Sequence, residues 1–383
     1  MVSTSQNGPR PRVVVVGAGI VGVSIALHLS LGGAQVTVLE AGQPGQGTSA
    51  VSFAWINARD KNPRHYHDLN RRSLDMWPRL ARQLGGDIGL TWGGELRWAA
   101  SPAEAEDMQA RVAQLQSWGY PIRLLEPGRV KALEPALLTG PITTASYTPI
   151  DGHVDTGKVV RACLDRLAER GTVFQTGSKV IGLQLTRPAH QPPGVEAVIT
   201  ESKEFACDAV VLAAGPDTPA LAAQAGITLP LYHTFGATIL TEPLPPIFQT
   251  AAVIHTSRQA IPPMNIRQLP DGSVMLHGGS HGGAEDRSLG QTDDEIAQVI
   301  EAAPQYIPAL KEAKIKAVRT GRRPIPNDGL PIIGFAKAAP NLYLSVMHSG
   351  VTLAALVGEF AAIEIINNVR IDLLEPYRIE RFD

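Results

Sequence analysis

Four consecutive valines, Val13 to Val16, lead directly into the sequence Gly17-Ala18-Gly19-Ile20-Val21-Gly22. A short run of β-branched residues predicts a buried strand, and the residues rich in Ala, Ile and Leu that follow predict a helix. In this strand–turn–helix context the Gly-x-Gly-x-x-Gly pattern indicates a dinucleotide site. Gly17 permits the tight turn, Gly19 lets the backbone approach a pyrophosphate, and Gly22 lets the helix pack close to the strand. The first amides of the helix would point at the phosphates, where the helix dipole also favours negative charge.

The next predicted strand ends in an acidic residue. Residues 35–39 read Gln-Val-Thr-Val-Leu and are followed by Glu40, 18 positions after Gly22. A carboxylate about 20 residues past the glycines binds a ribose hydroxyl in such folds. It also disfavours a 2′-phosphate, so NADP would fit poorly. The alternative interpretation is a glycine-rich turn in an ordinary βαβ unit that binds no nucleotide.

Composition narrows the class of partner. The chain has 383 residues, enough for two lobes, and a formal net charge of −2. A nearly neutral chain has no broad field for nucleic acid or an anionic membrane, so we expect a small-molecule partner and no nucleic acid. No run approaches the roughly 18 apolar residues of a membrane span, and the first ten residues lack the apolar core of a signal peptide. We therefore expect no membrane span and a cytoplasmic location.

Cysteines and histidines give no metal signature. Cys163 and Cys207 lie far apart in apolar contexts, which favours inert core residues over a disulfide or a metal pair. None of the ten histidines has a convincing ligand spacing, so we expect no metal site. His277 and His281 flank a glycine-rich stretch and could line a cavity, although a structural role is the more common one for such residues.

Nucleotide-type elements recur along the chain. Residues 208–215 predict an apolar strand that ends in a small-residue turn, as expected for a central parallel strand. Residues 351–367 predict a long apolar helix. Between these elements, residues 91–100 alternate like one strand, and residues 231–280 suggest several short strands of an antiparallel sheet, separated by Pro and Gly turns.

We predict an α/β fold in which a Rossmann-like nucleotide-binding domain is interleaved with an α+β substrate domain built on an antiparallel sheet. The nucleotide-binding domain would be discontinuous and comprise residues 1–60, 150–225 and 320–383. The substrate domain would comprise residues 61–149 and 226–319. Ligands favour the crevice beyond strand carboxyl ends and the junction between lobes, so we expect the site there.

Two segments near the C-terminus carry a more specific signal. Residues 321–334 read Gly-Arg-Arg-Pro-Ile-Pro-Asn-Asp-Gly-Leu-Pro-Ile-Ile-Gly, and residues 344–353 read Leu-Ser-Val-Met-His-Ser-Gly-Val-Thr-Leu. With the N-terminal glycines, these motifs stand in the order found in the D-amino-acid oxidase, glycine oxidase and sarcosine oxidase superfamily of FAD-dependent amine oxidoreductases. The chain resembles that superfamily over nearly its full length.

The resemblance implies FAD, and not NAD, as the cofactor. It places the N-terminus of the last helix at the pyrimidine end of the flavin, where the helix dipole would stabilise the anionic reduced ring. No histidine follows Ser49, and the position of the family's flavin-linking cysteine falls near Gly321, so the resemblance implies non-covalent FAD. The implied cofactor-binding residues are Gly17, Ala18, Gly19, Ile20, Val21, Gly22, Glu40, Ala41, Gly47, Thr48, Ser49, Ser52, Phe53, Ala54, Val180, Ala214, Gly215, His348, Ser349, Gly350, Val351 and Thr352.

The resemblance also implies a substrate site, with Arg323 and His348 as the candidate catalytic residues. In the glycine-oxidase-like branch the arginine matching Arg323 clamps the substrate carboxylate with two hydrogen bonds, a geometry that guanidinium suits. The alternative is a surface arginine in a salt bridge, a role that suits Arg322 better. His348 would contact the flavin ring, and Asn265 stands where those relatives add a tyrosine to the clamp. Thr352 stands where some sarcosine-oxidase-like members carry a lysine, so oxygen reactivity stays open.

The implied reaction is oxidation of the C–N bond of an amino acid or related amine, such as a D-amino acid, glycine or an N-alkyl amino acid. A hydride would pass to flavin N5, and the imine would hydrolyse to an oxo acid, with oxygen as the electron acceptor. One alternative is a dehydrogenase that passes electrons to a quinone or carrier, alone or as one subunit of a complex. Another is a binding protein that retains FAD without turnover. The state of assembly, homo-oligomer or complex with a partner subunit, stays open.

Overall fold

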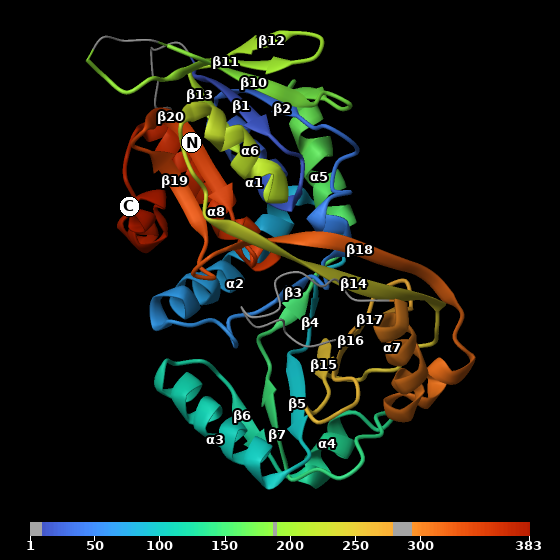
Figure 1. Cartoon of the computed structure of the whole chain (residues 1–383). Helices are drawn as coiled ribbons and strands as arrows, with labels where there is room; N and C mark the ends of the chain where they lie inside the picture. Colours follow the sequence, from blue (N-terminus) through green and yellow to red (C-terminus); the bar gives the residue numbers. More distant parts are fainter. Residues whose placement is uncertain (1–9, 187–189, 279–292) are drawn as a thin grey trace.

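The computed structural model describes residues 10–186, 190–278 and 293–383. Figure 1 shows two lobes, one above the other, with the C-terminus in the upper lobe. The upper lobe is built on a six-stranded sheet in the order β19-β20-β13-β1-β2-β9. Its strands are β1 (Arg12–Val16), β2 (Gln35–Leu39), β9 (Val173–Gln175), β13 (Ala209–Leu212), β19 (Ile332–Ala336) and β20 (Ala339–Val346).

The centre of this sheet is parallel. Strand β1 pairs in parallel with β2 and β13, and β13 pairs in parallel with β20, whereas β19 runs antiparallel to β20. A side sheet of β10 (Val180–Leu185), β11 (Val195–Thr200) and β12 (Glu204–Ala206) lies at the top of Figure 1. The helices of this lobe are α1 (Ile20–Leu31), α2 (Arg64–Leu84), α5 (Thr156–Glu169), α6 (Thr218–Ala222) and α8 (Gly350–Asn367). The predicted α/β fold is confirmed.

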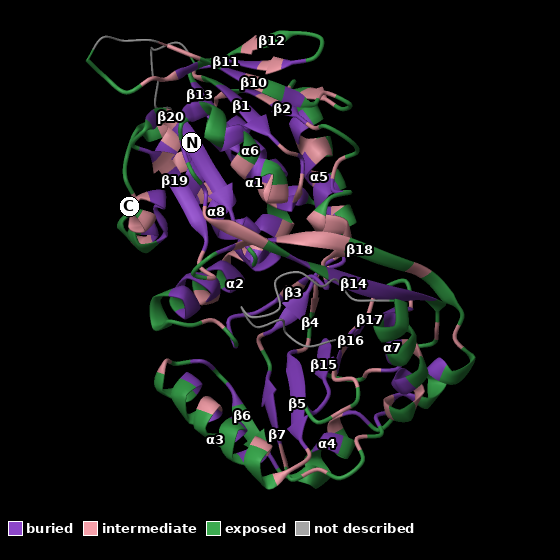
Figure 2. Cartoon of the chain, viewed as in Figure 1, coloured by how far each residue is buried: buried purple, intermediate pink, exposed green. Residues whose placement is uncertain are grey.

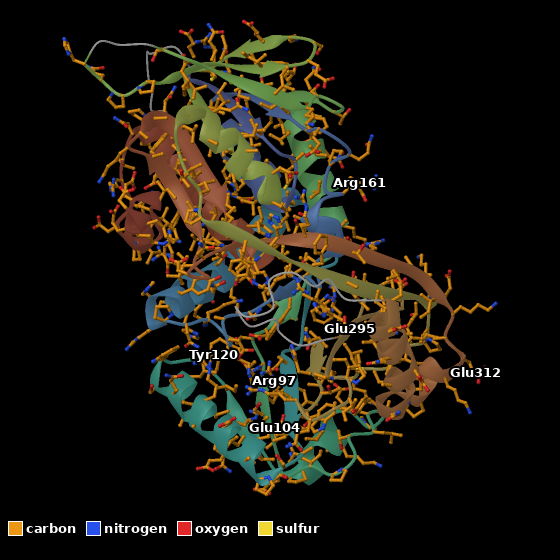
Figure 3. The ribbon with its side chains drawn as sticks, in the orientation of Figure 1. Arg97, Glu104, Tyr120, Arg161, Glu295 and Glu312 are labelled. Atoms are coloured by element: carbon orange, nitrogen blue, oxygen red, sulfur yellow. The ribbon has the colours of Figure 1, made fainter. Side chains whose placement is uncertain are left out.

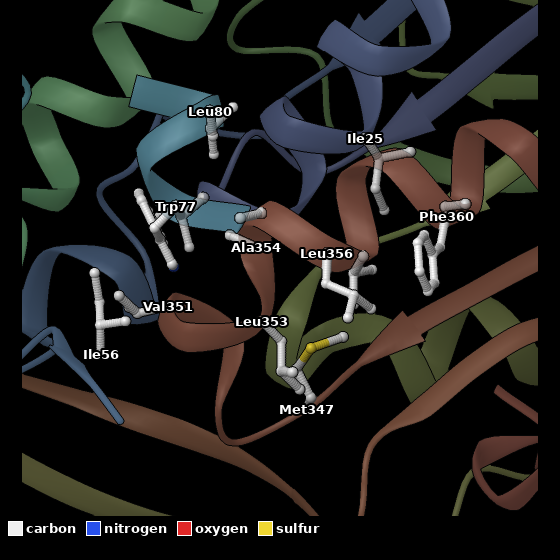
Figure 4. Close-up of a cluster of buried hydrophobic side chains, with 14 of the residues drawn as sticks. Ile25, Ile56, Trp77, Leu80, Met347, Val351, Leu353, Ala354, Leu356 and Phe360 are labelled. Atoms are coloured by element: carbon white, nitrogen blue, oxygen red, sulfur yellow. The ribbon is translucent and has the colours of Figure 1, made fainter. Parts of the chain in front are cut away.

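Helix α8 lies in the middle of the upper-lobe core. A Cβ at Gly358 would come 2.2 Å from Ser24 Oγ, so the glycine permits the close packing of α8 against α1. Figure 4 shows side chains of α1, α2 and α8, among them Ile25, Trp77 and Leu356, meeting in one buried cluster. A helix that is buried over most of its surface can be apolar around most of its circumference, which accounts for its sequence.

The expectation that no run reaches membrane-spanning length is corrected by this helix. Its 18 residues have a mean hydropathy of 1.5, so by length and composition it could cross a membrane, and it is the one such helix among the residues that the structure describes. Within this fold 67% of it is buried. Its apolar surface packs against α1, α2 and β19.

The lower lobe is built on an eight-stranded, mostly antiparallel sheet in the order β18-β14-β17-β16-β15-β5-β7-β6. Helices α4 (Pro127–Leu133) and α7 (Asp293–Tyr306) pack on one face, and α3 (Pro102–Ser117) packs beside β5, β6 and β7. Figure 2 shows most strand residues buried and the outer side of α3 exposed. The strands are β5 (Glu95–Ala99), β6 (Arg123–Leu125), β7 (Thr144–Thr148), β14 (Leu231–Pro243), β15 (Val253–His255), β16 (Met264–Gln268), β17 (Ser273–Gly278) and β18 (Ile315–Pro326).

Short elements complete the fold. A small sheet in the order β3-β8-β4 lies between the lobes and comprises β3 (Trp55–Ile56), β8 (Gly152–His153) and β4 (Thr91–Trp92). The 3-10 helices are η1 (Thr48–Val51), η2 (Gly215–Asp217), η3 (Ala223–Ala225), η4 (Pro308–Glu312), η5 (Asp372–Tyr377) and η6 (Ile379–Phe382).

The prediction of one strand over residues 91–100 was wrong, because two glycines divide it into β4 and β5. Gly93 and Gly94 have φ angles of 150° and 87°, which residues other than glycine rarely adopt. A Cβ at these positions would come 2.2 Å from Thr250 O and 1.9 Å from Thr148 O. The chain therefore turns at these glycines, and β5, which follows them, pairs with β7 and β15 of the large sheet.

The prediction of only short strands in residues 231–280 was also wrong. Strand β14 has 13 residues and pairs along most of its length with the 12-residue β18. In Figure 1 this ribbon crosses the junction between the lobes. Because β18 runs through residues 319 and 320, it also crosses one of the expected domain boundaries, and the boundaries themselves stay a prediction.

Candidate functional site

The N-terminal turn accepts only glycine at two positions. Gly17 has a φ of 104°, and a Cβ there would come 2.5 Å from Ala213 O. A Cβ at Gly22 would come 2.0 Å from the carbonyl oxygen of Gly17. Gly19 is the N-cap of α1 and has an extended backbone. The helix therefore begins directly beside the ends of β1 and β13, with its first amides at the sheet edge.

Two side chains face these amides. Glu40, at the end of β2, accepts hydrogen bonds from Ala18 N at 2.8 Å and from Gly42 N at 2.9 Å. Ser49 Oγ accepts from Ile20 N at 3.0 Å. A carboxylate at the end of the second strand, beside the glycine turn, is placed as a ribose-binding acid requires.

Three further cofactor candidates surround this turn. Val180 begins β10, two residues after Ser178, whose amide donates to Glu40 O at 2.9 Å. The Ala214-Gly215 turn follows β13, and a Cβ at Gly215 would lie 3.8 Å from Thr48 Oγ1. The fold thus gathers segments from residues 17–22, 40–49, 178–180 and 214–215 at the same sheet edge.

The N-terminus of α8 meets that of α1. Ser349 is the N-cap of α8 and accepts a hydrogen bond from Tyr66 OH at 2.7 Å. A Cβ at Gly350 would lie 3.2 Å from Val21 Cγ2, so α8 starts against the first turn of α1. Two helix N-termini at one place favour a ligand that carries negative charge. His348 directly precedes the N-cap and is exposed.

A ribbon of residues 52–59 separates the two lobes. Ala54, Ile56 and Ala58 belong to the upper-lobe core, whereas Phe53 packs with the inner face of the large sheet. Thr352 Oγ1 donates a hydrogen bond to Trp55 O and accepts one from Asn57 N, both at 3.2 Å. Helix α8 therefore holds this ribbon, and with it the residues predicted to line the flavin.

Arg323 and Arg322 have different surroundings, as alternation along β18 requires. The guanidinium of Arg323 lies over Gly236, where a Cβ would come 2.1 Å from Nη2, and it donates to His277 Nε2 at 2.8 Å. Among the described residues no carboxylate lies within 4.0 Å of it, and burial lowers its pKa. Arg322 forms an exposed ion pair with Asp217 at 2.8 Å. Of the two, Arg323 is the one available to an anionic ligand.

Asn265 pairs with His277, the hydrogen-bond partner of this arginine, in a polar row that crosses the inner face of the sheet. Cross-strand register pairs Arg97 with His255, His255 with Asn265, and Asn265 with His277. The side-chain amide of Asn265 is half-buried and makes no hydrogen bond to the part of the chain that the structure describes. It could therefore donate to, or accept from, a ligand held by Arg323.

The far end of the row is a buried charge cluster. Glu95 forms ion pairs with Arg59 and, at 3.1 Å, with Arg97, and it lies 3.1 Å from His255 Nδ1. Burial would raise the pKa of Glu95, but the two guanidinium groups lower it to about 2. Burial, reinforced by Arg97, lowers the pKa of His255 to about 4, so its imidazole is neutral at pH 7. Figure 3 marks Arg97 in the lower lobe, on β5.

A second buried acid, Asp151, contacts the ribbon of residues 52–59. Asp151 accepts hydrogen bonds from Trp55 Nε1 at 3.0 Å and from Tyr120 OH. Burial raises the pKa of Asp151 to about 8. The side chain of Trp55 also packs on His255, with ring centroids 4.5 Å apart. The ribbon is therefore fixed to both lobes through polar side chains.

Sequence patterns carry no clear signal for these buried polar residues. Glu95, Arg97, Asn265 and Arg267 alternate with apolar residues, so each reads as the exposed face of a strand. The face is covered here by the upper lobe, which only the tertiary structure reveals. Within residues 10–186, 190–278 and 293–383, no group of three or more His, Cys, Asp or Glu could hold a metal. His281 lies outside the described residues.

Both cysteines are buried and free. Burial raises the pKa of the Cys163 thiol to about 12 and that of Cys207 to about 11. Thiols with such values are poor nucleophiles, as predicted for inert core residues.

A protein-family model for the DAO family, described as FAD dependent oxidoreductase, matches residues 12–362. The chain belongs to this family. It is thus an enzyme that uses FAD. The glycine turn, the acid after β2 and the paired helix N-termini all suit the ribose and pyrophosphate of that cofactor.

Curated relatives and solved structures agree with this assignment. Glycine oxidase from Geobacillus kaustophilus is 25% identical over 92% of each chain. A subunit of opine oxidase from Agrobacterium tumefaciens is 27% identical over 97% of each chain. The crystal structure of the Geobacillus glycine oxidase has a TM-score of 0.83 at 24% identity, over 96% of this chain and 98% of that chain. L-proline dehydrogenase from P. horikoshii also has a TM-score of 0.83, at 23% identity over 98% and 99%. These structures share the predicted fold.

Proposed function

We propose that this enzyme oxidises the C–N bond of an amino acid or N-alkyl amino acid, with Arg323 holding the substrate carboxylate. The observation that carries the proposal is the surroundings of Arg323: a half-buried guanidinium beside the polar row, with no carboxylate partner among the described residues. A charge removed from water without a partner is costly, so an anionic ligand would be bound strongly there. Relatives named glycine oxidase and dimethylglycine dehydrogenase support a carboxylated amine as the substrate.

Each part of the site has a role in this reaction. When bound, FAD accepts the two electrons and the hydrogen of the substrate C–H bond. Arg323 fixes the carboxylate, and Asn265 adds a hydrogen bond to the same clamp. In this proposal the N-terminus of α8, with His348 and Thr352, stabilises negative charge at the pyrimidine end of the cofactor. The nitrogen lone pair drives the transfer, so no side-chain base is obligatory, and the imine product hydrolyses in water to an oxo acid.

The electron acceptor and the state of assembly are separate parts of the proposal. We propose non-covalent FAD, oxygen as the acceptor and a cytoplasmic enzyme. The relative that is named as one subunit of an opine oxidase supports an alternative, in which the chain belongs to a complex and passes electrons to a quinone or carrier. Comparing oxygen uptake with reduction of an artificial dye at equal substrate concentration separates the two.

The test of the reaction starts from the purified protein. Its visible spectrum should show bound flavin, and denaturation should release the flavin into solution if no covalent bond exists. Under anaerobic conditions, a panel of D-amino acids, glycine and N-alkyl amino acids is then added, with the matching amines that lack a carboxylate as controls. Loss of the flavin band with a carboxylated amine supports the proposal. A flavoprotein whose band no amine of the panel bleaches would refute it.

A further inference from the structure

Arg267 on β16 is a buried guanidinium in an unusual environment. The residue is 2% exposed. Its Nη1 donates to His153 Nδ1 at 2.9 Å and to Val154 O at 3.0 Å, and its Nη2 lies 3.3 Å from Met275 Sδ. The third nitrogen, Nε, is buried and has no hydrogen-bond partner in the described part of the chain. Thus an imidazole, a carbonyl and a thioether surround this charge.

No carboxylate in the described part of the chain forms an ion pair with it. Other buried arginines are paired: Arg59 and Arg97 with Glu95, and Arg378 with Glu364. For Arg267, no carboxylate among the described residues lies within 4.0 Å. Burial lowers its pKa to about 9, so the guanidinium remains charged at neutral pH. The more distant carboxylate of Asp155 favours the charged form, but a buried charge without an ion-pair partner remains unfavourable, so an anion bound close to the guanidinium would stabilise it further.

The position of Arg267 links it to the stretch predicted to line the flavin. Its guanidinium carbon lies 5.5 Å from the ring centroid of Phe53, over the ring face. Phe53 belongs to the ribbon of residues 52–59, next to Ala54, whose carbonyl oxygen accepts from Val154 N at 3.2 Å. The groups that surround the guanidinium are therefore the same ones that fix the stretch predicted to line the flavin.

We propose that Arg267 stabilises the negative charge that reaches the flavin ring during substrate oxidation, and so raises the reduction potential of the bound cofactor. This inference rests on the proposed function. A hydride carries two electrons and one proton, so its transfer from the substrate C–H bond delivers one net negative charge to the ring and leaves the substrate as an iminium ion. A fixed cation in a site of low dielectric stabilises the charged product more than the neutral reactant. The N-terminus of α8 acts from a different element, so the two contributions can be separated.

The test measures the equilibrium potential of the bound flavin, independently of turnover. Arg267→Met removes the charge and keeps an unbranched apolar chain, Arg267→Gln keeps some hydrogen bonding, and Arg267→Lys keeps the charge. Arg319→Met is the matched control, since Arg319 lies on the same sheet but is exposed to solvent. The potential of each holoenzyme is measured by equilibration with a reference dye at pH 7.

We expect the equilibrium constant for flavin reduction to fall at least tenfold in the Met and Gln variants, which is about 30 mV for a two-electron couple. The Lys variant and the Arg319 control should stay within threefold of the parent. If the Met and Gln variants fail to retain flavin, the Lys variant must retain it with a parent-like potential. Equal potentials in all variants, or loss of flavin from the Lys variant as well, would overturn the inference. If the parent binds flavin but no amine reduces it, the proposed function fails, while the potentials still test Arg267.

Discussion

Replacing Arg323 by alanine tests the substrate clamp most directly. A bidentate pair places two hydrogen bonds on a carboxylate, and hydrogen bonds to charged groups contribute about 1.5–3 kcal/mol each. Because the side chain is only half-buried, we take the lower part of that range, about 3–4 kcal/mol in total. At 1.4 kcal/mol per factor of ten, the apparent KM for carboxylated amines should rise by about 10²- to 10³-fold.

The same change should leave the fold intact. Arg323 donates to His277 but forms no ion pair among the described residues, so the variant loses one hydrogen bond and is relieved of a partly buried charge. We expect the free energy of unfolding to change by less than about 1 kcal/mol. Arg322→Ala is the matched control, since that side chain is 41% exposed in an ion pair with Asp217. It should change KM less than twofold.

The assay compares two substrates for each variant: an amino acid and the amine of the same skeleton without the carboxylate. Anaerobic flavin bleaching gives the apparent dissociation constant, and steady-state turnover gives KM and kcat. For Arg323→Ala the KM for the amino acid should rise toward that for the uncharged amine, whose own KM should change little. Equal losses for both substrates would refute the clamp, because they would show that the arginine acts on the fold or on the cofactor.

Three further predictions concern the cofactor cradle and the buried network. Gly22→Ala should abolish FAD binding, because its Cβ would meet a backbone carbonyl oxygen at 2.0 Å. The readout is flavin content per protein, and the control Gly128→Ala, in α4 and with no atom within 4 Å of the added Cβ, should bind FAD normally. Tyr66→Phe should lose the hydrogen bond to Ser349 at the N-terminus of α8 and lower the free energy of unfolding by about 1 kcal/mol in denaturant titrations; an unchanged value would show that the cap needs no such support. Asp151 has a folded-state pKa raised to about 8, above its unfolded value near 4, so its stabilising contribution is complete below pH 4 and is lost as the pH rises to 8. Asp151→Asn should therefore gain stability relative to the parent over that range and show no further gain above it; a pH-independent difference would contradict the raised pKa.

Much of the cofactor site could be predicted because its signals are local. The strand at residues 12–16, the glycines at 17 and 22 and the acid at position 40 lie within one βαβ unit, where backbone geometry restricts the residue type directly. The cap of α5 is also local, since the side chain of Asp155 accepts from Lys158 N three residues later. The split of residues 91–100 was missed because the glycine pair there is required by contacts with Thr148 and Thr250, which are distant in sequence.

The substrate side depended on the tertiary structure. The sequence by itself determined the α/β class and the glycine turn, and it predicted that Glu40 binds ribose. Family resemblance added FAD and the predicted role of Arg323. Only the folded chain decided that Arg322 pairs with Asp217 while Arg323 stays without an acid among the described residues, and that Glu95 and Arg267 are buried. The physical reason is that local backbone preferences act over a few residues, whereas burial and charge pairing depend on which face of a strand another lobe covers.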